Sequence, residues 1–192
     1  MDAFDYAYNK TLGLEGEYSD IPGDRGGRTK YGITETTLME AIRQGLIGAI
    51  GIRDLTPEQA RIIYKALYWN PLKLQGVKDI AIAAEIFDTA VNSGVKKAVL
   101  IAQLALEYLG ESINLDGAIG PATLNLINKW CVKDPRALFV ALNGIQFIHF
   151  CAIIDPHLID TIKTLVRPRA DQRQFARGWT RRIQEYRGKV SC

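Results

Sequence analysis

The chain is poor in histidine and cysteine, the residues that most often bind transition metals. Its 192 residues include only two histidines, and its three cysteines form no Cys-x-x-Cys pair. A zinc site or a disulfide framework is therefore not expected, and we expect neither a metal nor a cofactor. The net charge of only +3 likewise argues against a nucleic-acid partner, because nucleic-acid binders usually concentrate positive charge more strongly.

Long uninterrupted hydrophobic runs and a basic, apolar N-terminus are also missing. The first residues, Met-Asp-Ala-Phe-Asp-Tyr, are acidic and mixed, so no secretory signal peptide is visible. The most hydrophobic segment, residues 137–154, is interrupted by Asn143, Gln146 and His149 and ends at Asp155. A membrane span should be longer and cleaner, so we expect a buried helix with a polar edge and no stable membrane insertion.

Strand-like alternation is too short to build a sheet, whereas helical spacing recurs along the chain. Phe4, Tyr8 and Leu12 repeat every four residues, and Thr56–Gln59 combines an N-cap, a proline at the first helical position and a glutamine three residues after the cap. The pattern predicts an all-α protein with at most a small β-ribbon near residues 19–34.

A hydrophobic content of 47% is enough for a proper core. A soft boundary lies between Gly94 and Lys97. We therefore predict two helical regions, residues 1–94 and 95–192, packed together as one compact monomer.

The segment from Leu14 to Thr34 concentrates carboxylates, glycines, hydroxyls and aromatic rings between two helical patterns. Glu15 falls within roughly 20° of Phe4 on a helical wheel, so it extends the apolar face into the last turn. Partial desolvation and the negative helix C-terminus would both raise the pKa of this carboxyl, as a general acid requires. Glu17 has no such placement and is expected to be solvated.

A second carboxylate, Asp24, follows nine residues after Glu15 in a glycine-rich stretch beside Arg25. Arg25 and the loop amides would keep Asp24 ionised. Two carboxyls in contrasting environments are typical of glycoside hydrolysis, and Thr29 would help to hold a water beside Asp24. The alternative is that Glu15 is a surface residue at a helix end and that Asp24 only forms a turn.

At these residues the chain resembles a known family. The resemblance is carried by two runs: Glu15-Gly16-Glu17-Tyr18-Ser19 and Pro22-Gly23-Asp24-Arg25-Gly26-Gly27-Arg28-Thr29-Lys30-Tyr31-Gly32-Ile33-Thr34. They resemble the signature of glycoside hydrolase family 108, bacterial and phage N-acetylmuramidases of which some are described as secretion activators. Further similar motifs are Phe87-Asp88-x-Ala90-Val91-Asn92-x-Gly94, Asp116-Gly117-x-x-Gly120-Pro121-x-Thr123 and Gly178-Trp179-x-x-Arg182. The second of these resembles a turn of the peptidoglycan-binding region usual at the C-terminal end of this family.

The resemblance implies a lysozyme-like helical fold and hydrolysis of the β-1,4 bond between N-acetylmuramic acid and N-acetylglucosamine in peptidoglycan. It puts the catalytic glutamate at Glu15, and similarity to phage-type lysozymes assigns Asp24 and Thr29 as its catalytic partners. Two residues depart from the family pattern, Glu17 in place of Gly and Ile21 in place of Asp. If that Asp has a catalytic share elsewhere in the family, this chain lacks it, but neither change affects Glu15.

Substrate contacts are expected in the same motifs and at nearby aromatic side chains. The candidates are Tyr18, Tyr31, Trp69, Asp88 and Asn92. Aromatic rings would stack on sugars, with core packing as the alternative. Asn92 would bond an acetamido group or cap a helix near Gly94, and Asp88 would bond the substrate or pair with an arginine.

Other interpretations remain open beside hydrolysis. A peptidoglycan-binding or secretion accessory protein without activity and a lytic transglycosylase are both compatible with the motifs. Arg173, Arg177 and Arg181 form a stripe that either meets anionic wall polymers or is simply a solvated helix face. Because the substrate lies outside the cytoplasmic membrane and no signal is visible, we expect release through a holin-like pore or a dedicated export route.

Overall fold

Helices make up most of the regular structure. The structure is a computed structural model that describes residues 2–12, 28–155, 157 and 160. In that part of the chain the α-helices are α1 (Ala3–Leu12), α2 (Glu35–Arg43), α3 (Pro57–Tyr64), α4 (Ile80–Ser93), α5 (Val95–Tyr108), α6 (Pro121–Lys133) and α7 (Pro135–Ile154). Shorter helical turns are η1 (Ile52–Asp54), η2 (Lys65–Trp69) and η3 (Leu74–Gly76). Strands β1 (Thr29–Lys30) and β2 (Ile33–Thr34) pair antiparallel, which confirms a mainly helical, lysozyme-like fold with one small ribbon.

Side-chain caps begin several of these helices, including the helix start that the sequence predicts at Thr56. Thr56 and Gln59 form a reciprocal capping box at α3, and Pro57 occupies its first turn. Thr34 ends the ribbon and also caps α2 by accepting a hydrogen bond from the Thr37 backbone N–H. Asp79 caps α4 by accepting from two backbone N–H groups. These local interactions explain why helix starts are readable from the sequence.

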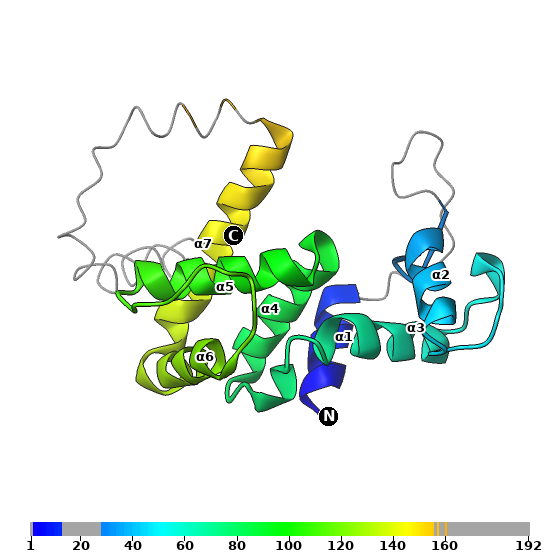
Figure 1. The fold of residues 1–192 in the computed structure, drawn as a ribbon, viewed down its shortest axis with the longest axis horizontal. Coiled ribbons are helices and arrows are strands. Elements are labelled where there is room, and N and C mark those ends of the chain that lie inside the picture. Colours follow the sequence, from blue (N-terminus) through cyan, green and yellow to red (C-terminus); the bar gives the residue numbers. More distant parts are fainter. Residues whose placement is uncertain (1, 13–27, 156, 158–159, 161–192) are drawn as a thin grey trace, which may run out of the picture.

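The packing of α1 against α4 organises the first half of the chain (Figure 1). Phe4 from α1 and Phe87 from α4 meet edge-to-face with ring centroids 5.9 Å apart. Trp69 packs edge-to-face against both rings and is only 2% exposed. Trp69 is therefore a core residue, and the expectation that it stacks on a sugar is wrong because its ring is enclosed by other aromatic side chains.

The remaining helices surround the other side of α4. Figure 1 shows α4, α5, α6 and α7 on one side of α1, with α2 and the beginning of α3 on the other. α4 and α5 are separated only by Gly94, whose φ of +88° suits glycine. α7 then returns to pack against both α4 and α5. The helices on either side of the expected boundary near residue 94 are thus in direct contact.

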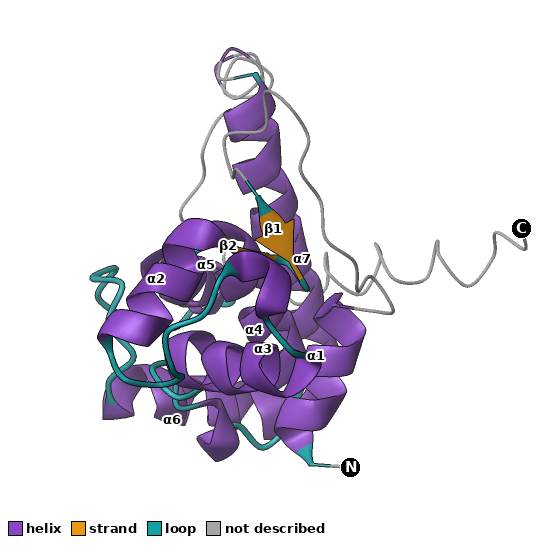
Figure 2. Cartoon of the chain, turned by 90° about the vertical axis from the view of Figure 1, so that its right-hand side faces the viewer, coloured by secondary structure: helices purple, strands orange, loops and turns teal. Residues whose placement is uncertain are grey.

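α7 is buried over only part of its length, which corrects the expectation of a buried helix. The C-terminal part projects away from the rest of the helices in two views (Figures 1 and 2), and Ile154 is 84% exposed. Among the described residues, α7 is the one helix long and apolar enough to cross a membrane by length and composition. Its buried side chains are Ala137, Leu138, Ala141, Leu142 and Gln146. The polar residues that interrupt the apolar run in the sequence therefore do not separate the buried part of α7 from its exposed part.

The tight turn of the ribbon depends on two residues with positive φ. Tyr31 has φ +52° and Gly32 has φ +71°, which is the backbone pattern of a two-residue hairpin turn matched to strand twist. The Tyr64 hydroxyl donates a hydrogen bond of 3.1 Å to the Tyr31 carbonyl. A Cβ atom at Gly32 would lie 2.6 Å from the Tyr64 hydroxyl oxygen, so glycine is required here for both conformation and space.

Replacing Gly32 by Ala should therefore destabilise the protein more than an ordinary glycine substitution. We expect the free energy of unfolding to fall by about 2–3 kcal/mol, from positive-φ strain plus the clash with Tyr64. Gly45 is a matched control, because its φ is +70° but nothing lies within 4 Å of an added Cβ. Gly45→Ala should cost only about 1 kcal/mol. Urea unfolding measures both, and equal losses would contradict the proposed clash.

Candidate active site

Both ends of the segment that carries the predicted catalytic carboxylates lie close together. The last turn of α1 reaches the hairpin, because a Cβ at Gly32 would lie 3.4 Å from Leu12 Cδ2. Tyr64 joins the two, since its ring packs edge-to-face on Tyr8 of α1 at 5.7 Å and its hydroxyl binds the Tyr31 carbonyl. Residues 13–27 thus connect two points that are held at one place in the fold.

Three predicted site residues lie on that connecting segment. Glu15, Asp24 and Tyr18 are outside the described residues, so their assigned roles remain predictions. The structure does describe the two elements that flank the segment, α1 before it and the β1–β2 hairpin after it. Segments carried by such rigid elements are common positions for catalytic residues.

The hairpin is fixed on more than one side. Thr29 is half-buried on β1 and lies opposite Thr34 in the ribbon register. The Lys30 ammonium donates a hydrogen bond of 2.5 Å to the Arg53 carbonyl in η1, and it also lies 5.5 Å from the centroid of the Tyr31 ring. Thr29 and Tyr31 are therefore held next to the point where the carboxylate segment rejoins the fold.

The phenols beneath the hairpin are held in their neutral form. Burial raises the pKa of Tyr8 and, more strongly, that of Tyr64. A neutral Tyr64 keeps its hydroxyl proton and so remains a donor to the Tyr31 carbonyl. Tyr68 packs against Tyr64 with centroids 5.6 Å apart, which places it in the same aromatic cluster. The support of the hairpin is thus expected to be insensitive to pH through the neutral range.

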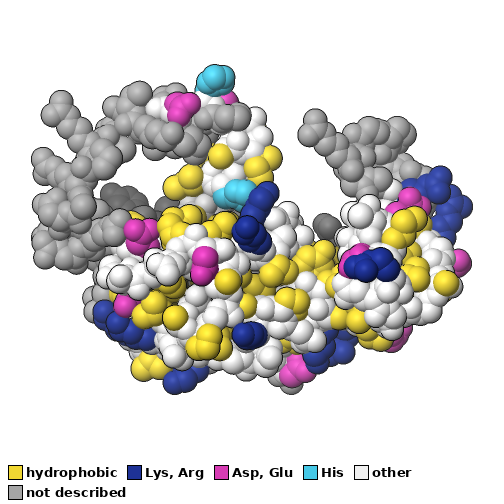
Figure 3. Space-filling view, in the orientation of Figure 1, with side chains coloured by type: hydrophobic (Ala, Val, Ile, Leu, Met, Phe, Trp, Pro, Cys, Tyr) yellow, Lys and Arg dark blue, Asp and Glu magenta, His cyan; other side chains and the backbone are white. Residues whose placement is uncertain are grey.

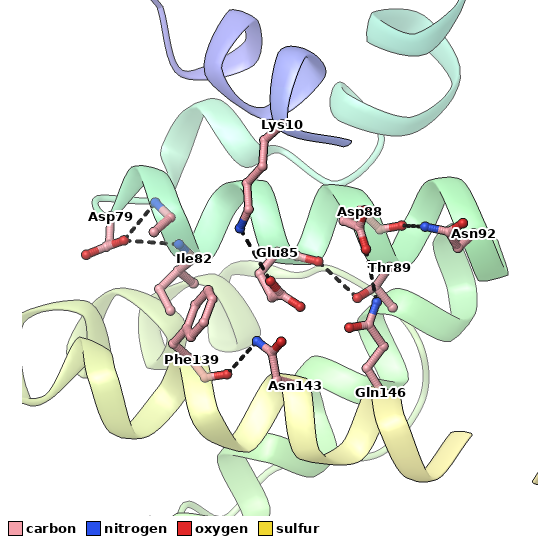
Figure 4. Close-up of polar contacts among 11 residues, drawn as sticks. Lys10, Asp79, Ile82, Glu85, Asp88, Thr89, Asn92, Phe139, Asn143 and Gln146 are labelled. Carbon is pink, nitrogen blue, oxygen red and sulfur yellow. Dashed lines mark hydrogen bonds and ion pairs between the residues drawn. The ribbon is translucent and has the colours of Figure 1, made fainter. Parts of the chain in front are cut away.

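The predicted polar contacts Asp88 and Asn92 lie one helical turn apart on α4 (Figure 4). Asp88 is half-buried, and its carboxylate accepts a hydrogen bond of 3.2 Å from the Gln146 amide of α7. Asn92 is exposed and donates a hydrogen bond of 2.9 Å back to the Asp88 carbonyl. Asp88 therefore pairs with an amide rather than an arginine, and the Asn92 amide donates within its own helix.

Glu85 is a buried carboxylate at this place that the sequence analysis did not single out. It is 6% exposed on α4, and the Lys10 ammonium of α1 lies 3.7 Å away (Figure 4). The same ammonium lies 5.3 Å from the centroid of the Phe139 ring of α7. Lys10 therefore connects the last turns of α1 to both α4 and α7. The available signal was one glutamate inside an otherwise apolar helical run from Ile80 to Phe87.

Burial raises the pKa of Glu85, and the nearby Lys10 ammonium offsets only part of this effect. The carboxylate of Asp88, one turn further along α4, raises the pKa of Glu85 further. This environment resembles that expected for a general acid, a carboxyl kept partly desolvated. Its ion pair with Lys10 is equally typical of a structural contact between helices.

The space around these groups differs from a groove elsewhere in the described part of the chain. Figure 3 shows the surface indented between the side that carries α7 and the side that carries α2, and α1 lies between these two sides in Figure 1. A groove of about 750 Å³ lies instead between the start of α4 and α7, lined by Ile82, Phe139, Val140 and Phe147 among others. Asp88 and Asn92 are not among its lining residues. In the described part of the chain, no three His, Cys, Asp or Glu side chains gather as a metal site would require.

Two protein-family models match the chain. The family model described as "Glycosyl hydrolase 108" matches residues 8–94, and the model described as "Predicted Peptidoglycan domain" matches residues 97–184. Residues 8–94 of the chain are a glycoside hydrolase family 108 region. A solved structure titled "Structure of Brucella abortus SagA" is similar over 97% of this chain and 92% of that chain, with 25% sequence identity and a TM-score of 0.61. No curated protein sequence matches the chain.

The family 108 match contains α1 from Tyr8 onward, the hairpin and the whole of α4. The peptidoglycan-domain match contains α5 from Lys97 onward, α6 and α7. Together the two matches identify peptidoglycan as the partner, and the chain as a hydrolase or a binder of it.

The environment of Glu85 predicts a pH-dependent stability. A raised native pKa means that the native state binds the proton more tightly than the unfolded chain, so the free energy of unfolding falls as pH rises from the ordinary value of 4.5. Glu85→Gln removes this titration. We expect the variant to gain stability relative to the wild type between about pH 4 and about pH 7, as measured by urea unfolding.

Glu40→Gln provides a control of opposite sign. Hydrogen bonds from Arg43 and Gln44 lower the pKa of Glu40 to about 2, so its contribution is lost only as pH falls towards that value. The difference between Glu40→Gln and wild type should stay constant above about pH 5. If the free energy of unfolding of Glu85→Gln and that of the wild type change in parallel between about pH 4 and about pH 7, the raised pKa of Glu85 is refuted.

Proposed function

We propose that the chain is an N-acetylmuramidase that hydrolyses the β-1,4 bond between N-acetylmuramic acid and N-acetylglucosamine in peptidoglycan. The observation that supports this most directly is the family 108 match over residues 8–94, the region in which α1 and the hairpin frame the segment with Glu15. In this proposal Glu15 protonates the glycosidic oxygen as the bond breaks.

The other catalytic carboxylate in this proposal is Asp24. In its ionised form Asp24 either stabilises the oxocarbenium-like transition state or activates the attacking water. Thr29, half-buried on the hairpin, would orient that water from the point where the segment rejoins the fold. The proposal favours an attacking water between the two carboxyls and therefore inversion of configuration.

The neighbouring described side chains fit a polymeric sugar substrate. Tyr31 lies at the tip of the hairpin and is half-buried, which leaves part of its ring for contact with a sugar. Asp88 and Asn92 add polar groups on α4. These residues make up the substrate contacts of the proposal, together with Tyr18 on the carboxylate segment.

Replacing Glu15 by Gln tests the general acid. Gln keeps the size of the side chain but cannot donate the catalytic proton, so we expect clearing of purified cell walls to fall by at least about 100-fold. Turbidity of a peptidoglycan suspension measures the loss, and an unchanged thermal unfolding curve shows that the fold is intact. Glu17→Gln is the matched control and should retain most of the activity. A Glu15→Gln variant that still clears walls would overturn the assignment.

The products released by the wild type separate the remaining alternatives. Mass analysis should find muropeptides with reducing N-acetylmuramic acid ends, because a muramidase adds water across the bond. Anhydro ends would instead identify a lytic transglycosylase. Absence of any release, with binding retained, would identify a peptidoglycan-binding or secretion accessory protein.

Asp24→Asn, followed by the anomeric configuration of the product, tests the second carboxylate. With inversion, the wild type first releases the anomer opposite to that of the substrate bond, and Asp24→Asn slows that release by about 100-fold or more. Proton NMR of a soluble glycan fragment resolves the two anomers. Retention of configuration would overturn the water-activating role and assign Asp24 as nucleophile or stabiliser of the intermediate state.

A further inference from the structure

A separate hollow of about 330 Å³ lies in the region that matches the peptidoglycan domain. It is formed by the loop after α5 and the beginning of α6, far along the chain from the hairpin. Its lining includes Ser112, Ile113, Asn114, Asp116, Ala122 and Leu126. Polar side chains and apolar side chains both contribute, as is usual for a site that binds a small polar group.

A buried amide shapes this loop. Gln103 of α5 is 1% exposed, and its Nε2 donates to Asp116 Oδ1 at 2.7 Å and to the Ala118 carbonyl at 3.2 Å. Its Oε1 accepts a hydrogen bond of 2.9 Å from the Gly117 backbone N–H. The Gln103 amide thus uses both its nitrogen and its oxygen in hydrogen bonds to residues 116–118, and it holds this part of the loop beside the hollow in place.

The lining of the hollow contains both a hydrogen-bond acceptor that carries negative charge and donors that carry partial positive charge. Hydrogen bonds from Gln103 and the Ala118 N–H lower the pKa of Asp116, so its exposed carboxylate is anionic at neutral pH. α6, whose first turn also lines the hollow, begins without a side-chain cap because Gly120 occupies the capping position. The first N–H groups of a helix have no acceptor within the helix and carry partial positive charge. Ala122 lies in this first turn and lines the hollow.

We infer that this hollow is the peptidoglycan-binding subsite of the C-terminal region and that it holds one secondary amide of the polymer. The amide carbonyl would accept from the N–H groups at the start of α6, and the amide N–H would face the Asp116 carboxylate. Ile113 and Leu126 would cover the adjoining methyl or methylene group. This inference rests on the peptidoglycan-directed function proposed above and is independent of Glu15.

Secondary amides of this kind occur in two parts of peptidoglycan. One source is the acetamido group of the amino sugars, and the other is the peptide stem. Both present a carbonyl acceptor and an N–H donor, and the lining of the hollow offers donors at the start of α6 and an acceptor at Asp116. The experiment must therefore distinguish the sources.

Ala122→Trp tests the hollow by filling it. Ala122 is exposed in the first turn of α6 and makes no part of the Gln103 network, so the fold should be retained. Binding is measured by co-sedimentation with purified cell walls, in a Glu15→Gln background that leaves the walls uncut. We expect at least about tenfold weaker binding. The control is Asn125→Trp, which adds the same ring at an exposed position of α6 outside the hollow and should bind like the parent.

Equal binding by both tryptophan variants, or an equal loss in both, would overturn the inference. If Ala122→Trp fails to fold, the double variant Ser112→Ala with Asn114→Ala removes polar lining groups at exposed positions and should also weaken wall binding. NMR titration then identifies the source of the amide. N-acetylglucosamine oligomers or a synthetic stem peptide should shift the backbone signals of Gly117 and Ala122, and shifts with neither probe would overturn the inference.

The binding assay is also separable from the proposed catalysis. A wild-type chain that binds walls through the hollow but releases no muropeptides would refute the muramidase while supporting this subsite. A chain that cuts walls, but in which Ala122→Trp leaves binding unchanged, would support the muramidase and refute the subsite.

Discussion

One buried hydroxyl connects the core of the first region to the site above it. Tyr64 lies in an aromatic cluster with Tyr8, Tyr68 and Phe87, and its ring is almost fully enclosed. A buried phenol needs a hydrogen-bond acceptor, and the Tyr31 carbonyl at the tip of the hairpin provides it. The approach is so close that position 32 must be glycine. The hairpin is therefore positioned by the core rather than by its own two short strands, which alone would be marginally stable.

Paired polar groups also position α4, a helix that is otherwise mostly buried. Glu85 meets Lys10 of α1, while Asp88 meets Gln146 of α7 (Figure 4). A buried charge is tolerated only with compensating partners, so these contacts restrict how α1 and α7 can sit on α4. They supply orientation that apolar packing alone would define less sharply.

Features with local physical causes were predictable from the sequence. The capping box and the first-turn proline at Thr56–Gln59 depend on a few neighbouring residues, and the structure confirms them. The exclusion of Trp69 from the surface depends on Phe4 and Phe87, which are distant in the chain, so its burial was not readable from spacing. The partial burial of α7 was not predictable for the same reason. An apolar run shows that a segment is hydrophobic, but it does not show how much of that segment packs against a neighbouring helix.

The candidate site was predictable in part for the same reason. Motif resemblance led to the family and to the hairpin residues Thr29 and Tyr31, since those residues are contiguous in the sequence. Glu85 and Gln103 escaped attention because each is a single polar residue within an apolar run of its helix, and only tertiary contacts reveal what it does. A buried polar residue in an apolar run is worth testing for a distant partner, since an unpaired one would be costly.

α4 packs against helices of both regions and so connects them. It packs on α1, whose last turn leads to the carboxylate segment, and on α5, whose buried Gln103 shapes the loop over α6. Two sites carried by directly packed helices keep a defined separation, so binding at one raises the effective concentration of the polymer at the other. For an insoluble polymer, the benefit depends on geometry that permits both contacts along one strand or its cross-linked neighbour. The hollow at α6 would then act by retaining the wall near the hairpin, and its contribution should be larger for intact walls than for short soluble glycans.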